Sequence, residues 1–236
     1  MVCLQEVTAK SLIGWKGRLV PEGYEVETSL PTGDAPRGRR LGVLIASRHP
    51  LTPVKKSIGV PWPERLLTAD VRLPDSSQAL RVVCLHAPLS QDPDQVKART
   101  FEAVHASLAA LAPSVPTILC GDLNTPQHEA TDGTVQTFGQ TSTGKIRACT
   151  GQRQDDAERS ILTDLPGWHD AFRERHGYEA SDRSWKASTG TNPGYRLDHI
   201  FLSPNLTATA CEYDHIVREN RLSDHSAMYA TIGSVA

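Results

Sequence analysis

The stretch Thr117–Asn124, Thr-Ile-Leu-Cys-Gly-Asp-Leu-Asn, decides the fold: an apolar run typical of a buried strand ends in glycine and is followed by Asp122 and Asn124. Residues two apart on an extended segment point the same way, so this carboxylate and this amide are expected to face one site. Such a pair suits a hard cation together with a developing oxyanion. A simple Asx turn after the strand is the alternative interpretation.

Other short apolar runs predict six more strands, at Val2–Leu4, Leu41–Ala46, Leu66–Val71, Leu80–Leu85, Leu197–Leu202 and Met228–Ile232. Helical spacing predicts a helix over Asp94–Leu111, capped by Asp92 or Asp94, with others over Trp168–His176 and Ala9–Leu19. Thr125–Gln154 is polar and aperiodic, which predicts a long loop with one short element. Together these elements predict a layered α/β or α+β domain.

The composition is that of one ordinary globular domain spanning residues 1–236, with 39% hydrophobic residues and a net charge of −2. This charge argues against a purely electrostatic nucleic-acid binder. The one compact basic cluster, Arg37, Arg39 and Arg40, is either a solvated loop or a phosphate contact. Five dispersed cysteines predict buried thiols in a reducing compartment, and no apolar run approaches a membrane span. A cytoplasmic protein without membrane contact is therefore expected.

Polar residues with chemical potential recur at the ends of the predicted strands. Ser223–His225 offers a metal-binding carboxylate beside an imidazole, with a helix cap or turn as the alternative. Within the strand Leu197–Leu202, Asp198 is placed to accept a hydrogen bond from a histidine ring. Arg196 shares its face, and either contacts substrate or pairs with an aspartate across the sheet.

His86 and Glu6 also follow apolar runs, although each alone is more typical of a surface residue. Strands of one sheet tend to gather their ends along one rim. The coincidence of these residues at strand ends therefore predicts an active site there.

In this order the motifs resemble the endonuclease/exonuclease/phosphatase superfamily, which includes exonuclease III-type and deoxyribonuclease I-like metal-dependent phosphoesterases. The resemblance covers nearly the whole chain, and seven motifs in the right order make it specific. The matching segments are Leu4–Val7, Gly42–Leu51, Val83–His86, Gly121–Asn124, Asp170–Arg173, Arg196–Ile200 and Ser223–His225. The resemblance implies a four-layer α/β sandwich, in which two mixed β-sheets pack face to face with helices outside.

The resemblance also implies a role for each matching residue. Glu6 looks like the family's glutamate ligand of Mg²⁺, and Asp224 like a further metal-site aspartate. Asp122 matches the carboxylate that orients or deprotonates the attacking water. Asn124 matches the amide that holds the scissile phosphate.

The histidines match the family as well. His225 is implied to contact the phosphate, and Asp198 to orient its ring. His86 matches a second histidine of deoxyribonuclease-like and phosphatase-like members, for which Glu64 stands where those members place a glutamate partner. Trp185 is a candidate to stack on a base or an abasic sugar, with packing on the sheet as the alternative.

The sequence departs from the family at its beginning. Family members carry one more strand there, with an asparagine that helps to bind metal, whereas here no asparagine precedes Glu6. We therefore expect either that the sequence is truncated at its N-terminus relative to the family or that this protein does without that ligand. The loss of a central strand is expected to expose neighbouring backbone groups and to weaken metal binding.

Three functions follow as hypotheses. The first is a monomeric nuclease that uses Mg²⁺, or alternatively Mn²⁺, to cleave DNA or RNA. The second is a phosphatase or phosphodiesterase for a small phosphorylated molecule or a lipid head group. The third is a catalytically weak binding module, motivated by the absent first strand.

Overall fold

A computed structural model describes residues 1–31, 41–54, 58–74, 76–89, 94–111, 114–187 and 193–235. Its strands are β1 (Val2–Val7), β2 (Glu25–Thr28), β3 (Gly42–Ser47), β4 (Leu51–Pro53), β5 (Leu66–Val71), β6 (Leu80–His86), β7 (Thr117–Asp122), β8 (His128–Glu129), β9 (Val135–Gln136), β10 (His169–Asp170), β11 (Asp198–Leu202), β12 (Leu206–Asp214) and β13 (Ala227–Ser234). Its helices are α1 (Ala9–Leu19), α2 (Val96–Ala109), α3 (Gly151–Leu162), α4 (Ala171–His176) and α5 (Ile216–Glu219), with short 3₁₀ turns η1 (Val20–Glu22) and η2 (Pro63–Arg65). The predicted basic cluster and Asp92 lie outside the described residues.

One sheet of six strands forms the centre of the molecule, in the order β10-β11-β7-β6-β5-β4. Its two middle strands, β7 and β6, run parallel, and the other neighbours are antiparallel. Both middle strands are buried almost throughout, which fits their continuous apolar sequence. The sheet is therefore mixed, as predicted.

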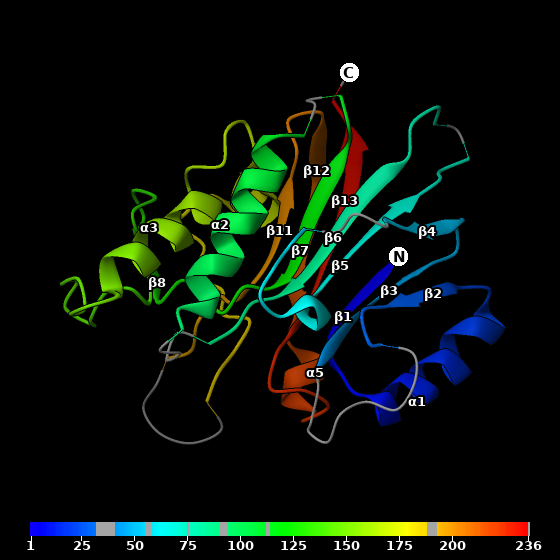
Figure 1. Ribbon diagram of the computed structural model, residues 1–236, viewed down its shortest axis with the longest axis horizontal. Coiled ribbons are helices and arrows are strands. Elements are labelled where there is room, and N and C mark those ends of the chain that lie inside the picture. Colours follow the sequence, from blue (N-terminus) through cyan, green and yellow to red (C-terminus); the bar gives the residue numbers. More distant parts are fainter. Residues whose placement is uncertain are drawn as a thin grey trace.

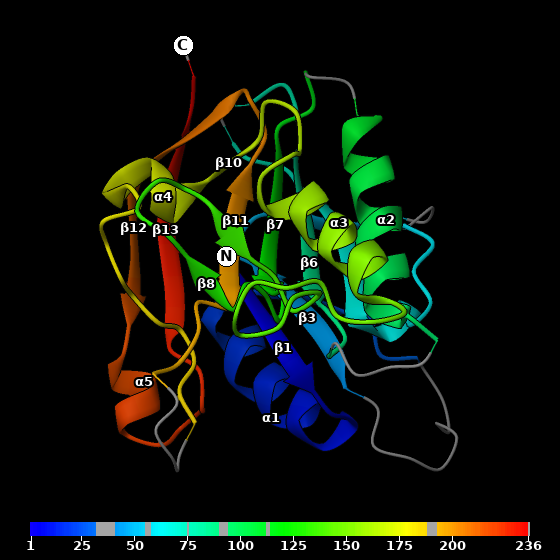
Figure 2. The ribbon, with the colours of Figure 1, turned by 90° about the vertical axis from the view of Figure 1, so that its left-hand side faces the viewer.

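The second β layer consists of two pieces, the three-stranded sheet β1-β3-β2 and the two-stranded sheet β12-β13 (Figures 1 and 2). Side chains from both pieces and from the central sheet share one hydrophobic core; Ile45, Cys84, Ile118 and Cys211 are among its members. The two pieces thus pack on the same face of the six-stranded sheet.

Helices cover the outer faces (Figure 1). Phe101 and Leu108 of α2 and Ile161 of α3 pack against Leu119 and its neighbours on the other face of the central sheet. On the far side, Leu12 of α1 packs against the outer face of β1 and β3. The result is the predicted four-layer α/β sandwich, with a divided second sheet.

A groove of about 750 Å³ separates the two pieces of the second layer. Its walls are residues of β1 and β13, and its floor includes Ile118 and Ile200 of the central sheet. In the described part of the chain β1 pairs only with β3, and β13 only with β12, so both present a free edge to the groove.

All seven predicted strands are present, and the predicted helices correspond to α1, α2 and α4. Strands β2, β4, β8, β9, β10 and β12 and helices α3 and α5 were not predicted, and β8, β9 and the start of α3 lie within the segment expected to be a loop with one short element. In α3, the buried face carries Asp155 and Glu158, so the helix lacks the apolar periodicity that betrays a buried face. In β12 a bulge between Ala208 and Ala210 breaks the alternation.

Residue Gln95 occupies the N-cap of α2 without a side-chain cap bond, so the predicted aspartate cap is not at that position. Within the described residues, no helix is both long and apolar enough to cross a membrane.

Candidate active site

Strand register gathers the predicted residues at one end of the central sheet. His86 at the end of β6 is the Cα partner of Asp122 at the end of β7, and Asp198 at the start of β11 is its partner on the other side. The three residues therefore lie in a row across adjacent strands. This arrangement is the one expected when strand ends converge on one rim of the sheet.

Only glycine fits at position 121, just before Asp122. Its φ is +134°, and a Cβ there would stand 2.0 Å from the carbonyl oxygen of Leu85. The neighbouring strand thus approaches closely enough to set Asp122 beside His86.

A bulge in β1 turns Glu6 toward the site. The register of β1 against β3 shifts between Leu4 and Val7, and Glu6 adopts φ 55°. Its side chain is 59% exposed, and Oε1 lies 3.9 Å from Nε2 of His86. Glu6 is therefore free to meet a ligand at the mouth of the groove.

Asp122 uses its two oxygens differently. Oδ1 accepts a hydrogen bond from the backbone N–H of Asn124 at 2.8 Å, so the Asx turn is present. Oδ2 lies 3.7 Å from His86 Nε2 and 4.0 Å from His225 Nε2. The Asx turn and the active site are thus compatible, because Oδ1 of Asp122 forms the turn and Oδ2 faces the site.

The side chain of Asn124 is oriented by the same segment. Asn124 adopts φ 51°, and its Nδ2 donates to the carbonyl of Ala87 at 2.8 Å. The Nδ2 group has a second N–H available for a substrate oxygen.

His225 is held by Asp198, as the sequence predicts. Nδ1 lies 2.7 Å from Asp198 Oδ2, which directs Nε2 toward Asp122. Burial alone would lower the pKa of His225. The hydrogen bond and charge of Asp198, with the charges of Asp122 and Asp224, instead raise this pKa to about 9. His225 is therefore a cation at neutral pH.

Asp122 shows the opposite perturbation. Burial, and then repulsion from Asp198, raise the pKa of Asp122 to about 7, against the favourable charges of His225 and Lys97 and the N–H of Asn124. Two carboxylates are thus crowded beside one imidazolium.

The partner of His86 is Arg65, not Glu64. Arg65 Nη1 lies 2.8 Å from Nδ1 and 3.0 Å from Nε2 of His86, because η2 presents this residue just before β5. Burial, followed by the charges of Arg65 and His225, lowers the pKa of His86 to about 3. A neutral ring forms no ion pair with Glu6 or Asp122. The distances of 3.9 Å and 3.7 Å from His86 Nε2 to their carboxylate oxygens are therefore contacts of a neutral ring with these groups. Sequence reasoning missed Arg65, although it directly precedes a predicted strand.

Asp224 and Trp185 meet at the rim. Trp185 Nε1 donates to Asp224 Oδ2 at 3.1 Å, and one face of its ring stacks on Tyr195 with centroids 5.7 Å apart. The alternative of packing on the protein therefore holds for that face. Stacking on a substrate stays a prediction.

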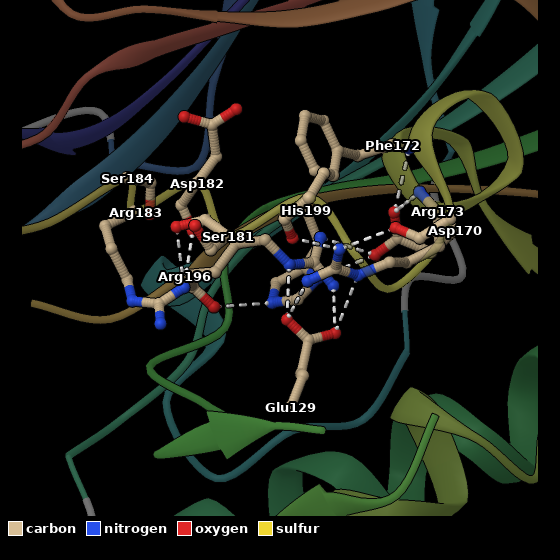
Figure 3. Close-up of polar contacts among 12 residues, drawn as sticks. Glu129, Asp170, Phe172, Arg173, Ser181, Asp182, Arg183, Ser184, Arg196 and His199 are labelled. Atoms are coloured by element: carbon tan, nitrogen blue, oxygen red, sulfur yellow. Dashed lines mark hydrogen bonds and ion pairs between the residues drawn. The ribbon is translucent and has the colours of Figure 1, made fainter. Parts of the chain in front are cut away.

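Arg196 is not at the groove. Its guanidinium is 3% exposed and pairs with Glu129 at 2.6 Å and with Asp170 at 2.8 Å (Figure 3). Arg173 holds the same Glu129 at 2.7 Å. The expected contact with substrate is thus unsupported, and the cross-sheet arginine–aspartate alternative describes this residue.

The same network reaches the site through His199. Its Nδ1 lies 2.9 Å from Asp170 Oδ2, and its Nε2 lies 2.9 Å from the carbonyl oxygen of Thr125 (Figure 3 shows His199 beside Asp170). Thr125 directly follows Asn124. The network therefore supports the loop that follows β7, at Asn124 and Thr125.

A second buried ion pair supports this loop from the helix layer. Lys97 of α2 donates to the carbonyl oxygen of Asn124 at 2.7 Å and pairs with Glu158 of α3 at 3.0 Å. Glu158 also accepts a hydrogen bond from the hydroxyl of Thr125. Neither Lys97 nor Glu158 was predicted, because nothing in their local sequence signals a contact so far along the chain.

Among the described residues, the ligand atoms of Asp122, Asp198 and His225 lie within 4.8 Å of one another and could hold a metal ion. Glu6 and Asp224, the predicted metal ligands, line the same groove but are outside this group. Asp122 and Asp198 are two carboxylates close together, and a divalent cation would relieve the repulsion between them. The acidic and imidazole donors of this group therefore fit such an ion.

The model of the Endonuclease/Exonuclease/phosphatase family matches residues 1–225. The chain belongs to this family. As a member of the Endonuclease/Exonuclease/phosphatase family, the chain is a phosphoesterase. No curated protein matches the sequence significantly.

Solved structures share the fold. An AP endonuclease from Archaeoglobus fulgidus aligns with a TM-score of 0.69 at 21% identity, over 97% of this chain and 87% of the other. TDP2 from D. rerio, in complex with a single-stranded DNA product, aligns with a TM-score of 0.67 at 18% identity, over 98% of this chain and 85% of the other. At these identities the likeness concerns the fold alone.

Proposed function

We propose that the chain is a nuclease that hydrolyses phosphodiester bonds with the help of a divalent cation, for which Mg²⁺ is the best candidate. The observation that carries the proposal is the group Asp198, His225 and Asp122, in which the partly buried carboxylate of Asp198 fixes the imidazolium of His225 near the carboxylate of Asp122 at the groove.

His225 is suited to contact the phosphate. Because Nδ1 donates to Asp198, the remaining N–H of the imidazolium, on Nε2, is directed to the groove. A fixed N–H that carries positive charge stabilises the negative charge that develops on phosphate oxygens. The neighbouring cation Arg65 adds to the positive potential there.

Asp122 is suited to orient the attacking water and to accept its proton. Its Oδ1 is held by the turn, while Oδ2 faces the imidazoles. Asn124, whose carbonyl and side chain are both anchored, presents its second amide N–H to the scissile phosphate. General base catalysis by a positioned carboxylate contributes about 10²–10⁴ in rate.

Glu6 and Asp224 would hold the cation. They offer hard oxygen ligands on the same groove, which Mg²⁺ prefers and Mn²⁺ also accepts. The metal would neutralise phosphate charge when bound.

The nucleic-acid substrate rests on relatives of the same fold. One is an AP endonuclease, and the other binds a single-stranded DNA product. Monomeric state and cytoplasmic location stay predictions.

The experiment is a panel of supercoiled plasmid, abasic duplex, single-stranded DNA and RNA, and a soluble phosphoester, each with Mg²⁺, Mn²⁺ or EDTA. The expected result is strand cleavage with Mg²⁺ that EDTA abolishes and that His225→Ala reduces by about 10²–10⁴. His49→Ala is the matched control. His49 is exposed and follows the end of β3. Gly42, at the opposite end of β3, pairs with Val7 next to Glu6, so His49 lies at the end of the strand away from Glu6.

Phosphate release from the soluble phosphoester alone would favour the phosphatase hypothesis instead. No turnover on any substrate with either metal would refute the enzymatic role and favour a binding module.

A further inference from the structure

Three cysteines from three strands converge between the two β layers. Cys84 of β6 and Cys120 of β7 are direct neighbours in the parallel register, and Cys3 of β1 approaches from the opposite layer. Their sulfur atoms all lie within 4.8 Å of one another. The other two cysteines, Cys149 and Cys211, are not part of this group.

The spacing of these sulfur atoms is close to that of a metal–thiolate site. With a Zn–S bond of about 2.3 Å, sulfurs in a trigonal or tetrahedral arrangement stand ~3.8–4.0 Å apart. Sulfurs already within 4.8 Å of one another reach this separation by movements of less than about 1 Å. Small χ1 adjustments suffice for such movements.

The cluster is also accessible. Cys84 is completely buried, but Cys3 is only partly buried, and both Cys3 and Cys120 line the groove of about 750 Å³. Gln5, which lines the same groove, places its amide nitrogen 3.4 Å from Cys84 Sγ. An ion entering the groove therefore meets thiols from two directions and a side-chain amide beside them.

We propose that Cys3, Cys84 and Cys120 form a binding site for a thiophilic d¹⁰ cation of the Zn²⁺ class, separate from the carboxylate and histidine site. Thiolate sulfur is a soft ligand that selects such ions over Mg²⁺. Three thiolates leave a net charge of −1 with Zn²⁺ and −2 with Cu⁺. Because an uncompensated charge is costly between sheets, the divalent ion is favoured. Water in the groove completes a fourth position, and the Gln5 amide donates a hydrogen bond to the sulfur of Cys84.

Each thiol that binds the ion releases its proton to solvent. A bound ion would join β1 to β6 and β7, and thereby connect the two layers.

The test is a titration of the reduced full-length chain with Co²⁺, which reports on bound thiolates through charge-transfer absorption. An excess of Mg²⁺ is present to occupy the carboxylate site. The expected result is one Co²⁺ per chain with thiolate absorption, and its displacement by Zn²⁺. Cys3→Ser should weaken Co²⁺ binding by at least about tenfold. Cys211→Ser and Cys149→Ser, one buried and one exposed, are the matched controls and should bind like wild type.

Absence of thiolate absorption in the wild type, or equal binding by Cys3→Ser, would overturn the proposal. Should Cys3→Ser not fold, alkylation of the wild type decides. Zn²⁺ should slow the modification of Cys3 but not that of Cys149, and an equal rate with and without Zn²⁺ would count against the site. Neither readout depends on phosphoesterase activity. Failure of the metal-site proposal would therefore leave the proposed function unaffected, and failure of the proposed function would leave the metal-site proposal unaffected.

Discussion

Glu129→Gln removes a carboxylate that bridges two buried guanidinium groups while keeping the size of the side chain. In the folded protein Glu129 lies 2.6 Å from Arg196 and 2.7 Å from Arg173. Burial opposes its ionisation, but the charge and hydrogen bonds of Arg196, with those of Arg173, hold its pKa at about 2, against an ordinary value of 4.5. At about 1.4 kcal/mol per factor of ten, this difference is worth ~3 kcal/mol of stability.

The sign of the pH dependence follows from the direction of the shift. Because the folded pKa is depressed, the contribution is complete well above pH 4.5 and is lost as the pH falls toward 2. The wild type should therefore exceed Glu129→Gln in free energy of unfolding by ~3 kcal/mol at pH 7 and by ~2 kcal/mol at pH 3.5.

Urea unfolding followed by circular dichroism measures both values. Glu102→Gln is the matched control, since Glu102 also pairs bidentately with an arginine, Arg153, but 43% of its side chain is exposed. Such a surface pair contributes less than about 1 kcal/mol. A loss at Glu129 no larger than at Glu102, or a loss that stays the same at pH 3.5, would refute the reasoning.

Three further perturbations have defined outcomes. Gly121→Ala should prevent stable folding, or cost more than about 4 kcal/mol in a thermal melt, because the new Cβ would meet the carbonyl of Leu85. Lys97→Met leaves the charge of Glu158 buried and should cost about 3–5 kcal/mol in urea unfolding, so a near-neutral effect would contradict the pair. Asp198→Asn removes the negative charge that keeps His225 protonated and should lower kcat about 10²–10⁴-fold on whichever substrate is cleaved, while the urea midpoint stays close to that of the wild type.

The sequence predicts the strands and the site residues at their ends because both depend on short-range pattern. Continuous apolar runs identify buried strands, and polar residues that end them must meet at a rim. Asp122, Asp198 and His225 are brought together for this reason. The Asx turn at Asn124 and the active site looked like competing interpretations, but the two oxygens of Asp122 allow both.

Contacts between distant segments could not be predicted in the same way. The alternation of side chains along a strand places Arg196 and Asp198 on one face. It does not predict whether the side chain of Arg196 points into the groove or pairs with a buried carboxylate, as it does with Asp170. Arg65 reaches His86 because it directly precedes β5, whose first residue Leu66 pairs with Leu85 of β6, next to His86. The buried face of α3 carries Asp155, which pairs with Arg159 of the same helix, and Glu158, which pairs with Lys97 of α2, so its sequence resembles that of a polar loop.

The two buried ion-pair networks have one target in common. His199, held by Asp170, contacts the carbonyl of Thr125, and Lys97, held by Glu158, contacts the carbonyl of Asn124. Buried ion pairs add little net stability over apolar packing, so their presence on both sides of one turn calls for another explanation. Asn124 adopts a left-handed backbone, which a non-glycine residue keeps only when its surroundings fix it. Directional contacts to two successive carbonyl oxygens supply that constraint, and they set the amide of Asn124 beside Asp122 before any substrate binds.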